Sequence, residues 1–199
     1  MDWNARYADS TYLFGTDAAQ ALTQHHRLLR PASTVLCVAD GEGRNSTFLA
    51  EQGHDVTAFD PSSNALDKAR ALARARKVEV AHEQADLEAY AWPPAAFDAV
   101  VGIFIQVVSP PERAHLFRNM AQTLSPGGVL FLHGYAPRQV QYGTGGPPTP
   151  DNMYTVPLLE EAYPGWEVLR ASDYDAEIHE GTGHSGRSAL IDFVARKPL

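Results

Sequence analysis

Apolar and polar positions along this chain follow two periods, and their alternation predicts strands separated by helices. Short apolar runs that read as strands are followed by stretches whose apolar residues recur at helical spacing. Strands that alternate with helices are typical of a doubly wound parallel sheet, so we predict an α/β fold. The predicted strands are 34–39, 56–59, 77–81, 99–105 and 129–135, and the predicted helices are 44–52, 61–76 and one that starts at the capping box 109–112.

The alternation stops near the C-terminus. Two strand-like runs, 166–178 and 188–197, are joined by the glycine-rich segment 180–187. Such a connection predicts an antiparallel hairpin in place of another strand–helix–strand unit. Residues 136–154 contain QYGTGGPPTP and predict a long irregular loop near the active site. We therefore expect a Rossmann-like sheet, mostly parallel and completed by a hairpin, in a single domain spanning 1–199.

Composition and charge narrow the classes of partner. The chain has 199 residues, a formal net charge of −8 and no run of Lys or Arg, which argues against nucleic acid as substrate. It begins MDWNARY, without a basic or apolar leader, and no apolar run approaches the length of a membrane span. Its single cysteine, Cys37, lies in a predicted strand and excludes a disulfide within the chain. We predict a cytoplasmic protein with a small-molecule substrate and no membrane partner.

The candidate chemistry lies in residues 34–60, which read as a strand, a glycine turn, a helix and a second strand ending on Asp60. A helix N-terminus after a glycine turn, with an acid at the end of the next strand, suits a nucleoside cofactor. The dinucleotide fingerprint needs a third glycine where this chain has Ser46. The alternative frame is A-x-G-x-G, formed by Ala39, Gly41 and Gly43.

This frame resembles the first motif of the class I S-adenosylmethionine-dependent methyltransferases, with Asp60 at the position of their ribose-binding acid. Cys37 replaces an acid that is common in that strand, and Ala39 replaces the usual first glycine. The segments 85–87, 97–101 and 124–128 resemble three further motifs of the family. The resemblance implies the strand order 3-2-1-4-5-7-6, S-adenosylmethionine as cofactor and S-adenosylhomocysteine as product. The cofactor-binding residues that it implies are Ala39, Asp40, Gly41, Gly43, Asn45, Asp60, Asp86, Leu87 and Ile103.

A finer resemblance is to the small bacterial tellurite-resistance and thiopurine- or thiol-methyltransferase-like subfamily. Residues 3–7, 12–15, 43–45 and 180–187 carry it. In that subfamily the N-terminal aromatic segment folds over the cofactor, so residues 1–30 are expected to form an aromatic and helical lid. Within it, the aromatic residues Trp3, Tyr7, Tyr12 and Phe14 precede a helix that Thr16 is expected to cap. Packing into the core is the alternative for these aromatic residues. The residues expected in the lid and substrate pocket are Tyr12, Phe14 and Tyr135.

The methyl acceptor is less constrained by the sequence. The chain lacks the Asn/Asp-Pro-Pro-Tyr/Phe motif of amide methyltransferases, and its histidines show no ligand spacing, so no metal is predicted. A small acceptor, such as a thiol or a chalcogen oxyanion, is the expectation. A non-catalytic nucleoside-binding sensor or partner subunit is the alternative outside the enzymes, and an NAD-dependent oxidoreductase is the alternative within them. The catalytic candidates are His133, His184, Arg187 and Gln106.

Overall fold

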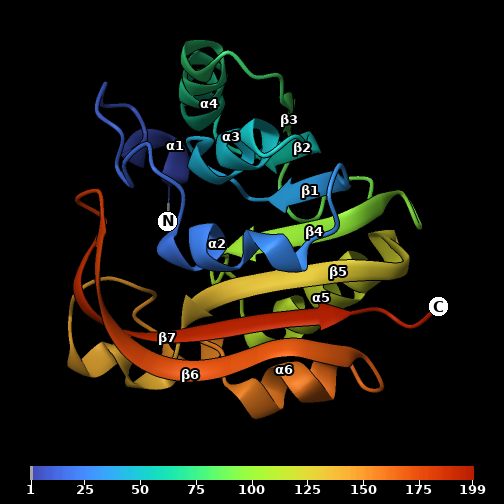
Figure 1. Ribbon diagram of the computed structural model, residues 1–199. Helices are drawn as coiled ribbons and strands as arrows, with labels where there is room; N and C mark the ends of the chain where they lie inside the picture. The colour runs from blue at the N-terminus through green and yellow to red at the C-terminus, as the bar shows by residue number, and fades with distance from the viewer. Residues whose placement is uncertain (1) are drawn as a thin grey trace.

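The computed structural model describes residues 2–199 and contains a seven-stranded sheet in the order β3-β2-β1-β4-β5-β7-β6 (Figure 1). The pairs from β3 through β5 are parallel, and β7 pairs antiparallel with both β5 and β6. The predicted fold class and strand order are therefore confirmed. The strands are β1 Thr34–Val38, β2 Asp55–Asp60, β3 Ala81–Gln84, β4 Phe97–Ile103, β5 Leu124–Tyr135, β6 Glu167–Glu180 and β7 His184–Arg196.

Helices cover both faces of the sheet. Side chains of α2 and α3 share one buried cluster with β1, β2 and β4, while α5 and α6 pack in a second cluster on the opposite face. No helix among residues 2–199 is long and apolar enough to cross a membrane. The helices are α1 Trp3–Arg6, α2 Gln20–His25, α3 Arg44–Glu51, α4 Ser63–Arg76, α5 Pro110–Thr123 and α6 Val156–Ala162, with 3₁₀ turns at His26–Leu28, Pro137–Gln141 and Pro150–Asn152.

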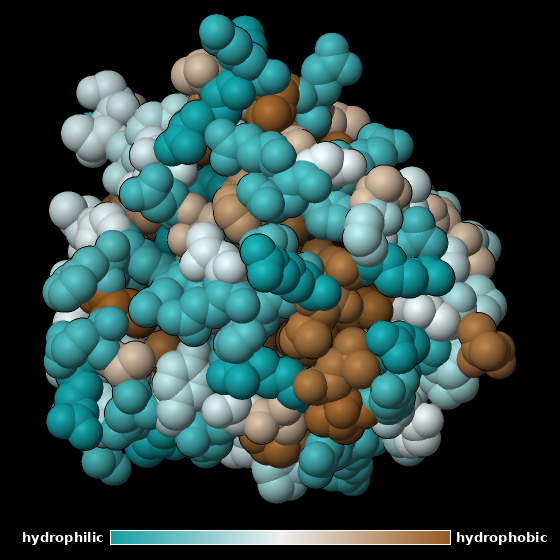
Figure 2. All heavy atoms as spheres, in the orientation of Figure 1, coloured by the Kyte–Doolittle hydropathy of each residue, from teal (hydrophilic) through white to brown (hydrophobic). Residues whose placement is uncertain are grey.

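Alternation along β1 explains the two clusters. Leu36 and Val38 face the α5 side, whereas Val35 and Cys37 face the α2 side, and all four are buried. A strand that is buried on both faces reads as a continuous apolar run, which is typical of a central parallel strand. Figure 2 shows that the near face of the molecule is mainly hydrophilic, with hydrophobic atoms gathered to the right of centre, over the region where β5 and β7 run in Figure 1.

Local capping fixes the helix starts that the sequence predicts. Ser62 accepts the backbone N–H of Ala65 at 3.1 Å at the start of α4, and Glu112 accepts the backbone N–H of Ser109 at 2.8 Å at the start of α5. The predicted third strand at 77–81 is wrong, because β3 begins at Ala81. Lys77 instead takes a left-handed conformation (φ 58°), and the N–H of Val78 closes α4 on the carbonyl of Ala73.

The C-terminal hairpin has a shorter loop than predicted. Glu180 pairs with His184, so only residues 181–183 form the turn, and Arg187 lies within β7. The predicted Thr16-capped helix is also wrong. Helix α2 begins at Gln20, and Ala19 holds the N-cap position without a side-chain hydrogen bond.

The N-terminus forms a short helix that the sequence did not predict. Asp2 caps α1 by accepting the N–H of Ala5 at 3.0 Å. In Figure 1, α1 and the segment after it lie beside the tip of the β6–β7 hairpin, and the backbone N–H groups of Thr182 and Gly183 both donate to Leu13 at 3.0 Å. The hairpin tip thus holds the N-terminal segment at the carboxyl ends of the central strands.

Candidate cofactor and acceptor site

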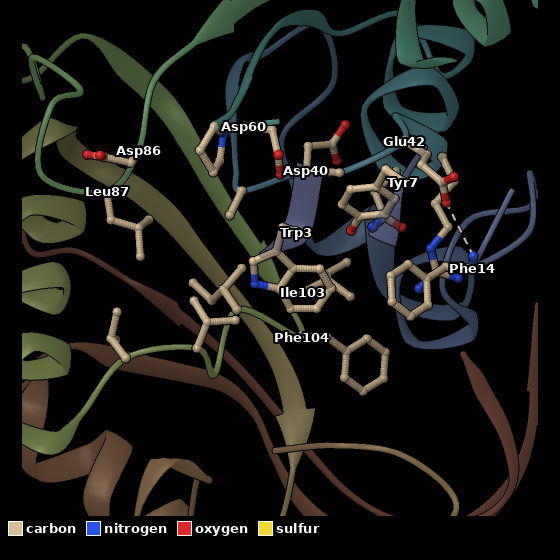
Figure 3. A pocket seen from close by; sticks show the side chains of 18 of the residues that line it. Trp3, Tyr7, Phe14, Asp40, Glu42, Asp60, Asp86, Leu87, Ile103 and Phe104 are labelled. Atoms are coloured by element: carbon tan, nitrogen blue, oxygen red, sulfur yellow. Dashed lines mark hydrogen bonds between the residues drawn. The ribbon is translucent and has the colours of Figure 1, made fainter. Parts of the chain in front are cut away.

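A cavity of about 350 Å³ opens at the carboxyl ends of β1, β2 and β4, below the N-terminal segment (Figure 3). Ligands bind at this edge in open parallel sheets, where the strand order reverses. Most of the predicted cofactor-binding residues meet here. The predicted residues that line the cavity are Ala39, Asp40, Gly41, Asn45, Asp60, Asp86, Leu87 and Ile103.

The glycine turn shapes one wall. Gly41 has φ +62°, and a Cβ at this position would lie 3.0 Å from the hydroxyl oxygen of Tyr7. Gly43 has φ +85°, and a Cβ there would lie 2.6 Å from that of Ala69 on α4. Gly43 does not line the cavity. It allows α3 and α4 to pack closely, so its place in the motif is explained by helix packing.

Asp60 ends β2 inside the cavity. One carboxylate oxygen accepts the N–H of Gly41 at 2.9 Å, and the other accepts the N–H of Ser62 at 2.9 Å. Burial raises the pKa of Asp60, while these two hydrogen bonds oppose the rise. The carboxylate therefore holds the glycine turn against β2, and each oxygen retains a lone pair for a ligand.

Asp40 adds a second acid to the same wall. The hydroxyl of Ser46 donates to its carboxylate, and burial raises the pKa of Asp40 to about 7. Ser46 thus serves this carboxylate at the position where the dinucleotide fingerprint has glycine. With Asp60, Glu42 and Asp86 also in the lining, the cavity is rich in acids. This set of carboxylates fits a cofactor with a positively charged sulfonium group, whereas the negatively charged pyrophosphate of a dinucleotide would face like charges.

Asp86 and Leu87 lie at the opposite end of the cavity from Phe14 (Figure 3). One oxygen of Asp86 accepts the backbone N–H groups of Glu88 at 2.9 Å and Ala89 at 2.7 Å, which fixes the loop after β3. Leu87 is half-buried beside it. This end of the cavity combines an acid with an apolar side chain.

A second cavity, of about 520 Å³, adjoins the first and shares Trp3, Phe14, Phe104, Val107 and His184 with it. Among the described residues that line it, Arg6 is the only Lys, Arg, Asp or Glu. The remaining lining residues are Gln106, Tyr135, Gly145, Gly146, Pro147, Pro148, Thr149, Asn152 and Gly183. Part of the predicted loop 136–154 therefore forms one wall.

His184 stands at the junction of the two cavities, on β7 and not in the predicted hairpin loop. Its ring centroid lies 4.3 Å from that of Phe14 and 4.2 Å from that of Phe104. Burial, followed by the positive charge of Arg44, lowers the pKa of His184 to about 3, so the ring is neutral near pH 7. Its Nδ1 is buried without a hydrogen-bond partner.

Three of the predicted catalytic and pocket residues are directed elsewhere. His133 is buried, and its Nδ1 lies 2.8 Å from Asp192. Neither His133, Arg187 nor Tyr12 lines either cavity. Arg187 is exposed and lies 3.3 Å from Asp175. The Tyr12 hydroxyl donates to the backbone carbonyl of Lys68 at 3.0 Å.

Gln106 lines the second cavity, but both the nitrogen and the oxygen of its side-chain amide are hydrogen-bonded to the backbone of Tyr135. The side-chain nitrogen donates to the Tyr135 carbonyl at 2.7 Å, and the side-chain oxygen accepts the Tyr135 N–H at 2.6 Å. Gln106 therefore fastens the loop after β4 to the end of β5. Phe104, which the sequence analysis did not select, instead forms the shared wall in a left-handed conformation with φ 57°.

No three His, Cys, Asp or Glu side chains gather as metal ligands anywhere in the part of the chain that the structure describes.

Comparison with known proteins gives a family match and a fold match. Residues 35–128 match the methyltransferase domain family. A ubiquinone biosynthesis O-methyltransferase from Coxiella burnetii is 31% identical over 99 residues, which are 49% of this chain and 42% of that protein. The chain therefore aligns with less than half the length of this curated relative.

Two solved structures share the fold over nearly the whole chain. TehB from Haemophilus influenzae superposes with a TM-score of 0.73 and 21% identity, covering 92% of this chain and 63% of that one. A structure described as the conversion of a disulfide bond into a thioacetal group during echinomycin biosynthesis superposes with a TM-score of 0.80 and 18% identity. The superposition covers 98% of this chain and 91% of that one. The match of residues 35–128 to the methyltransferase domain family, the strand order and the acid-lined cavity at the ends of β1 and β2 together support a class I S-adenosylmethionine-dependent methyltransferase.

Proposed function

We propose that this chain transfers a methyl group from S-adenosylmethionine, bound in the first cavity, to a small molecule bound in the second. The observation that carries the proposal is that the two cavities meet at Phe14, Phe104 and His184. A donor and an acceptor held on either side of this junction would be close enough for direct transfer. Holding them in line, away from water, is worth up to about 7–11 kcal/mol in favourable cases.

The assignment of the first cavity rests on its acids. Asp60 would accept from the ribose hydroxyls, Asp86 from the adenine amino group, and Leu87 would contact the ring. The acids near the glycine turn favour the positive charge of the cofactor. The remaining proposed cofactor contacts are Ala39, Asp40, Gly41, Asn45 and Ile103.

The acceptor is proposed to be an uncharged or anionic small molecule with a soft nucleophile, such as a thiol. The described lining of the second cavity contains no Asp or Glu that could pair with an ammonium group. Because burial lowers the pKa of His184 to about 3, this ring is a poor base for an amine or an alcohol. A thiol has an ordinary pKa of about 8.5 and needs little help to ionise.

The acceptors named for similar proteins differ from one another. The Coxiella relative is named as an O-methyltransferase, and the echinomycin structure is described by chemistry at a disulfide. An oxygen acceptor is therefore the second candidate. A non-catalytic sensor would need the first cavity alone, so the adjoining second cavity favours an enzyme.

Calorimetric titration with S-adenosylmethionine, S-adenosylhomocysteine and NAD tests the cofactor. We expect both sulfur nucleosides to bind and NAD not to bind. Incubation with S-adenosylmethionine and thiophenol, phenol or benzylamine, followed by detection of S-adenosylhomocysteine, tests the acceptor. Turnover with thiophenol supports the proposal, whereas binding without turnover of any acceptor in a broad panel favours the sensor. Turnover of benzylamine alone would contradict the proposed acceptor class.

A further inference from the structure

Side chains of the glycine turn and of the first residues of α3 hold the N-terminal segment in place. Glu42 accepts the backbone N–H groups of Leu13 at 3.2 Å and Phe14 at 3.3 Å. Asn45 accepts the N–H of Ala19 at 3.0 Å. Arg44 forms a buried ion pair with Glu180 at 2.7 Å, and Glu180 in turn accepts the N–H of Gln20 at 3.0 Å. Residues 13–20 are thus bound through their backbone by the turn and the hairpin.

Glu42 is the most buried acid of this set, with 3% of its surface exposed. Its carboxylate lies 2.8 Å from the ammonium group of Lys68 on α4. A buried carboxylate with a cation and two N–H donors is well compensated, and hydrogen bonds to a charged acceptor are stronger than neutral ones. This single side chain therefore joins three elements: the glycine turn, α4 and the N-terminal segment.

The bonds of Glu42 determine where the Phe14 ring lies. The neighbouring peptide is held from both sides, because Glu42 accepts from Leu13 while Thr182 and Gly183 donate to the Leu13 carbonyl. Figure 3 shows Glu42 and Phe14 at one end of the cavity, joined by a hydrogen bond. The Phe14 ring then forms part of the wall shared by both cavities and packs against the His184 ring at an interplanar angle of 37°.

We propose that Glu42 is a positioning residue, which closes the N-terminal segment over the cofactor by fixing Leu13 and Phe14. The proposal rests on the cofactor assignment of the proposed function. Because Glu42 belongs to the turn that would contact the cofactor, the same few residues shape the cofactor site and hold its cover. A more mobile cover would let bound S-adenosylhomocysteine leave faster.

Glu42→Gln keeps the shape of the side chain but removes its charge. Glu51→Gln is the matched control, because Glu51 ends α3, the helix that follows the glycine turn, and forms a more exposed ion pair with Arg76 at 3.4 Å. Amide hydrogen exchange at Leu13 and Phe14 measures the local opening, and stopped-flow displacement measures dissociation of S-adenosylhomocysteine. For Glu42→Gln we expect both rates to rise at least about tenfold, the effect of losing a charge-assisted hydrogen bond. For Glu51→Gln we expect neither rate to change.

Amides of β1 separate positioning from general destabilisation. The proposal would be overturned if Glu42→Gln raised the amide exchange rates of Leu13 and Phe14 no more than those of residues 35–38. An unchanged rate of S-adenosylhomocysteine dissociation would also overturn it. Phe14→Ala is the second variant. Phe14→Ala alone must raise the dissociation rate of S-adenosylhomocysteine at least about tenfold, a result that does not depend on whether Glu42→Gln folds. The double variant must dissociate little faster than either single variant, because both changes act on the same contact. Failure of the wild-type protein to bind S-adenosylhomocysteine would contradict the cofactor assignment, while the exchange experiment would still test the contact made by Glu42.

Discussion

Replacing Asp60 with alanine would remove the carboxylate at the end of β2 and with it two kinds of interaction. The first is internal, because the carboxylate accepts the backbone N–H groups of Gly41 and Ser62, each at 2.9 Å. The second is the proposed contact with the ribose hydroxyls. The two losses have different consequences, so stability and affinity must be measured separately.

The expected magnitudes follow from these contacts. A hydrogen bond to a charged group contributes about 1.5–3 kcal/mol, so losing even one ribose contact should weaken cofactor binding at least about tenfold. The two backbone donors would lose their partners, at about 1–3 kcal/mol each where they stay buried. Burial raises the pKa of Asp60, which means that its ionised form is less favourable in the folded chain than in the unfolded chain. Replacing Asp60 with alanine removes this unfavourable contribution to the stability. We therefore expect a smaller net loss of stability than the two donors alone would give.

Calorimetric titration with S-adenosylhomocysteine measures the affinity, and urea unfolding measures the stability. Asp55→Ala is the matched control, since Asp55 is exposed at the start of the same strand. We expect Asp55→Ala to bind like the wild type. If folded Asp60→Ala binds S-adenosylhomocysteine as tightly as the wild type, Asp60 does not bind the ribose and the cofactor assignment loses its main support.

Three further results are expected. Burial raises the pKa of Asp40 from 3.8 to about 7, so between these pH values Asp40 is protonated in the folded chain and ionised in the unfolded chain. The contribution of Asp40 to the free energy of unfolding therefore falls as the pH rises from about 4 to about 7. In urea unfolding, Asp40→Asn should abolish this dependence of stability on pH. Arg44→Ala leaves Glu180 buried without its cation and should cost about 3–5 kcal/mol in the same assay, whereas Arg70→Ala removes an exposed pair and should cost no more than about 1 kcal/mol. Saturating S-adenosylhomocysteine should protect residues 12–20 and 141–150 from limited proteolysis, and equal cleavage rates would favour simple packing of the aromatic segment.

Local signals predicted most of the fold. The strand of residues 34–38, the glycine turn and the capping box each depend on neighbouring residues, and all three are found. The third strand was misplaced because Val78 and Val80 read as β-formers, while Val78 instead closes α4 through its N–H. The strand order came from the family resemblance, since periodicity alone does not determine which strands are neighbours.

Side chains that meet from distant parts of the chain were harder to predict. The acids and small residues of the turn mark the cofactor cavity, but nothing near Glu42 in the sequence indicates that it binds the backbone of Leu13 and Phe14. His133 lies near the carboxyl end of β5, where ligand-binding residues gather, yet Asp192 on the neighbouring β7 binds it inside the sheet. A residue at the end of a strand is therefore a weak candidate until its partner on the adjacent strand is known.

The two cavities differ in charge, and this difference bears on the order of events at the site. Acids gather on the cofactor side, while Arg6 is the only Lys, Arg, Asp or Glu among the described residues that line the acceptor side. A cationic donor and a neutral or anionic acceptor would each meet a matching environment. Transfer of the methyl group removes the positive charge of the sulfonium, so the acids then face a neutral thioether and hold the product less strongly than the donor. In the proposed site, the charge that favours binding of the donor therefore also favours release of the product. The contacts proposed for Asp60 and Asp86, together with the cover that Glu42 would hold, oppose that release.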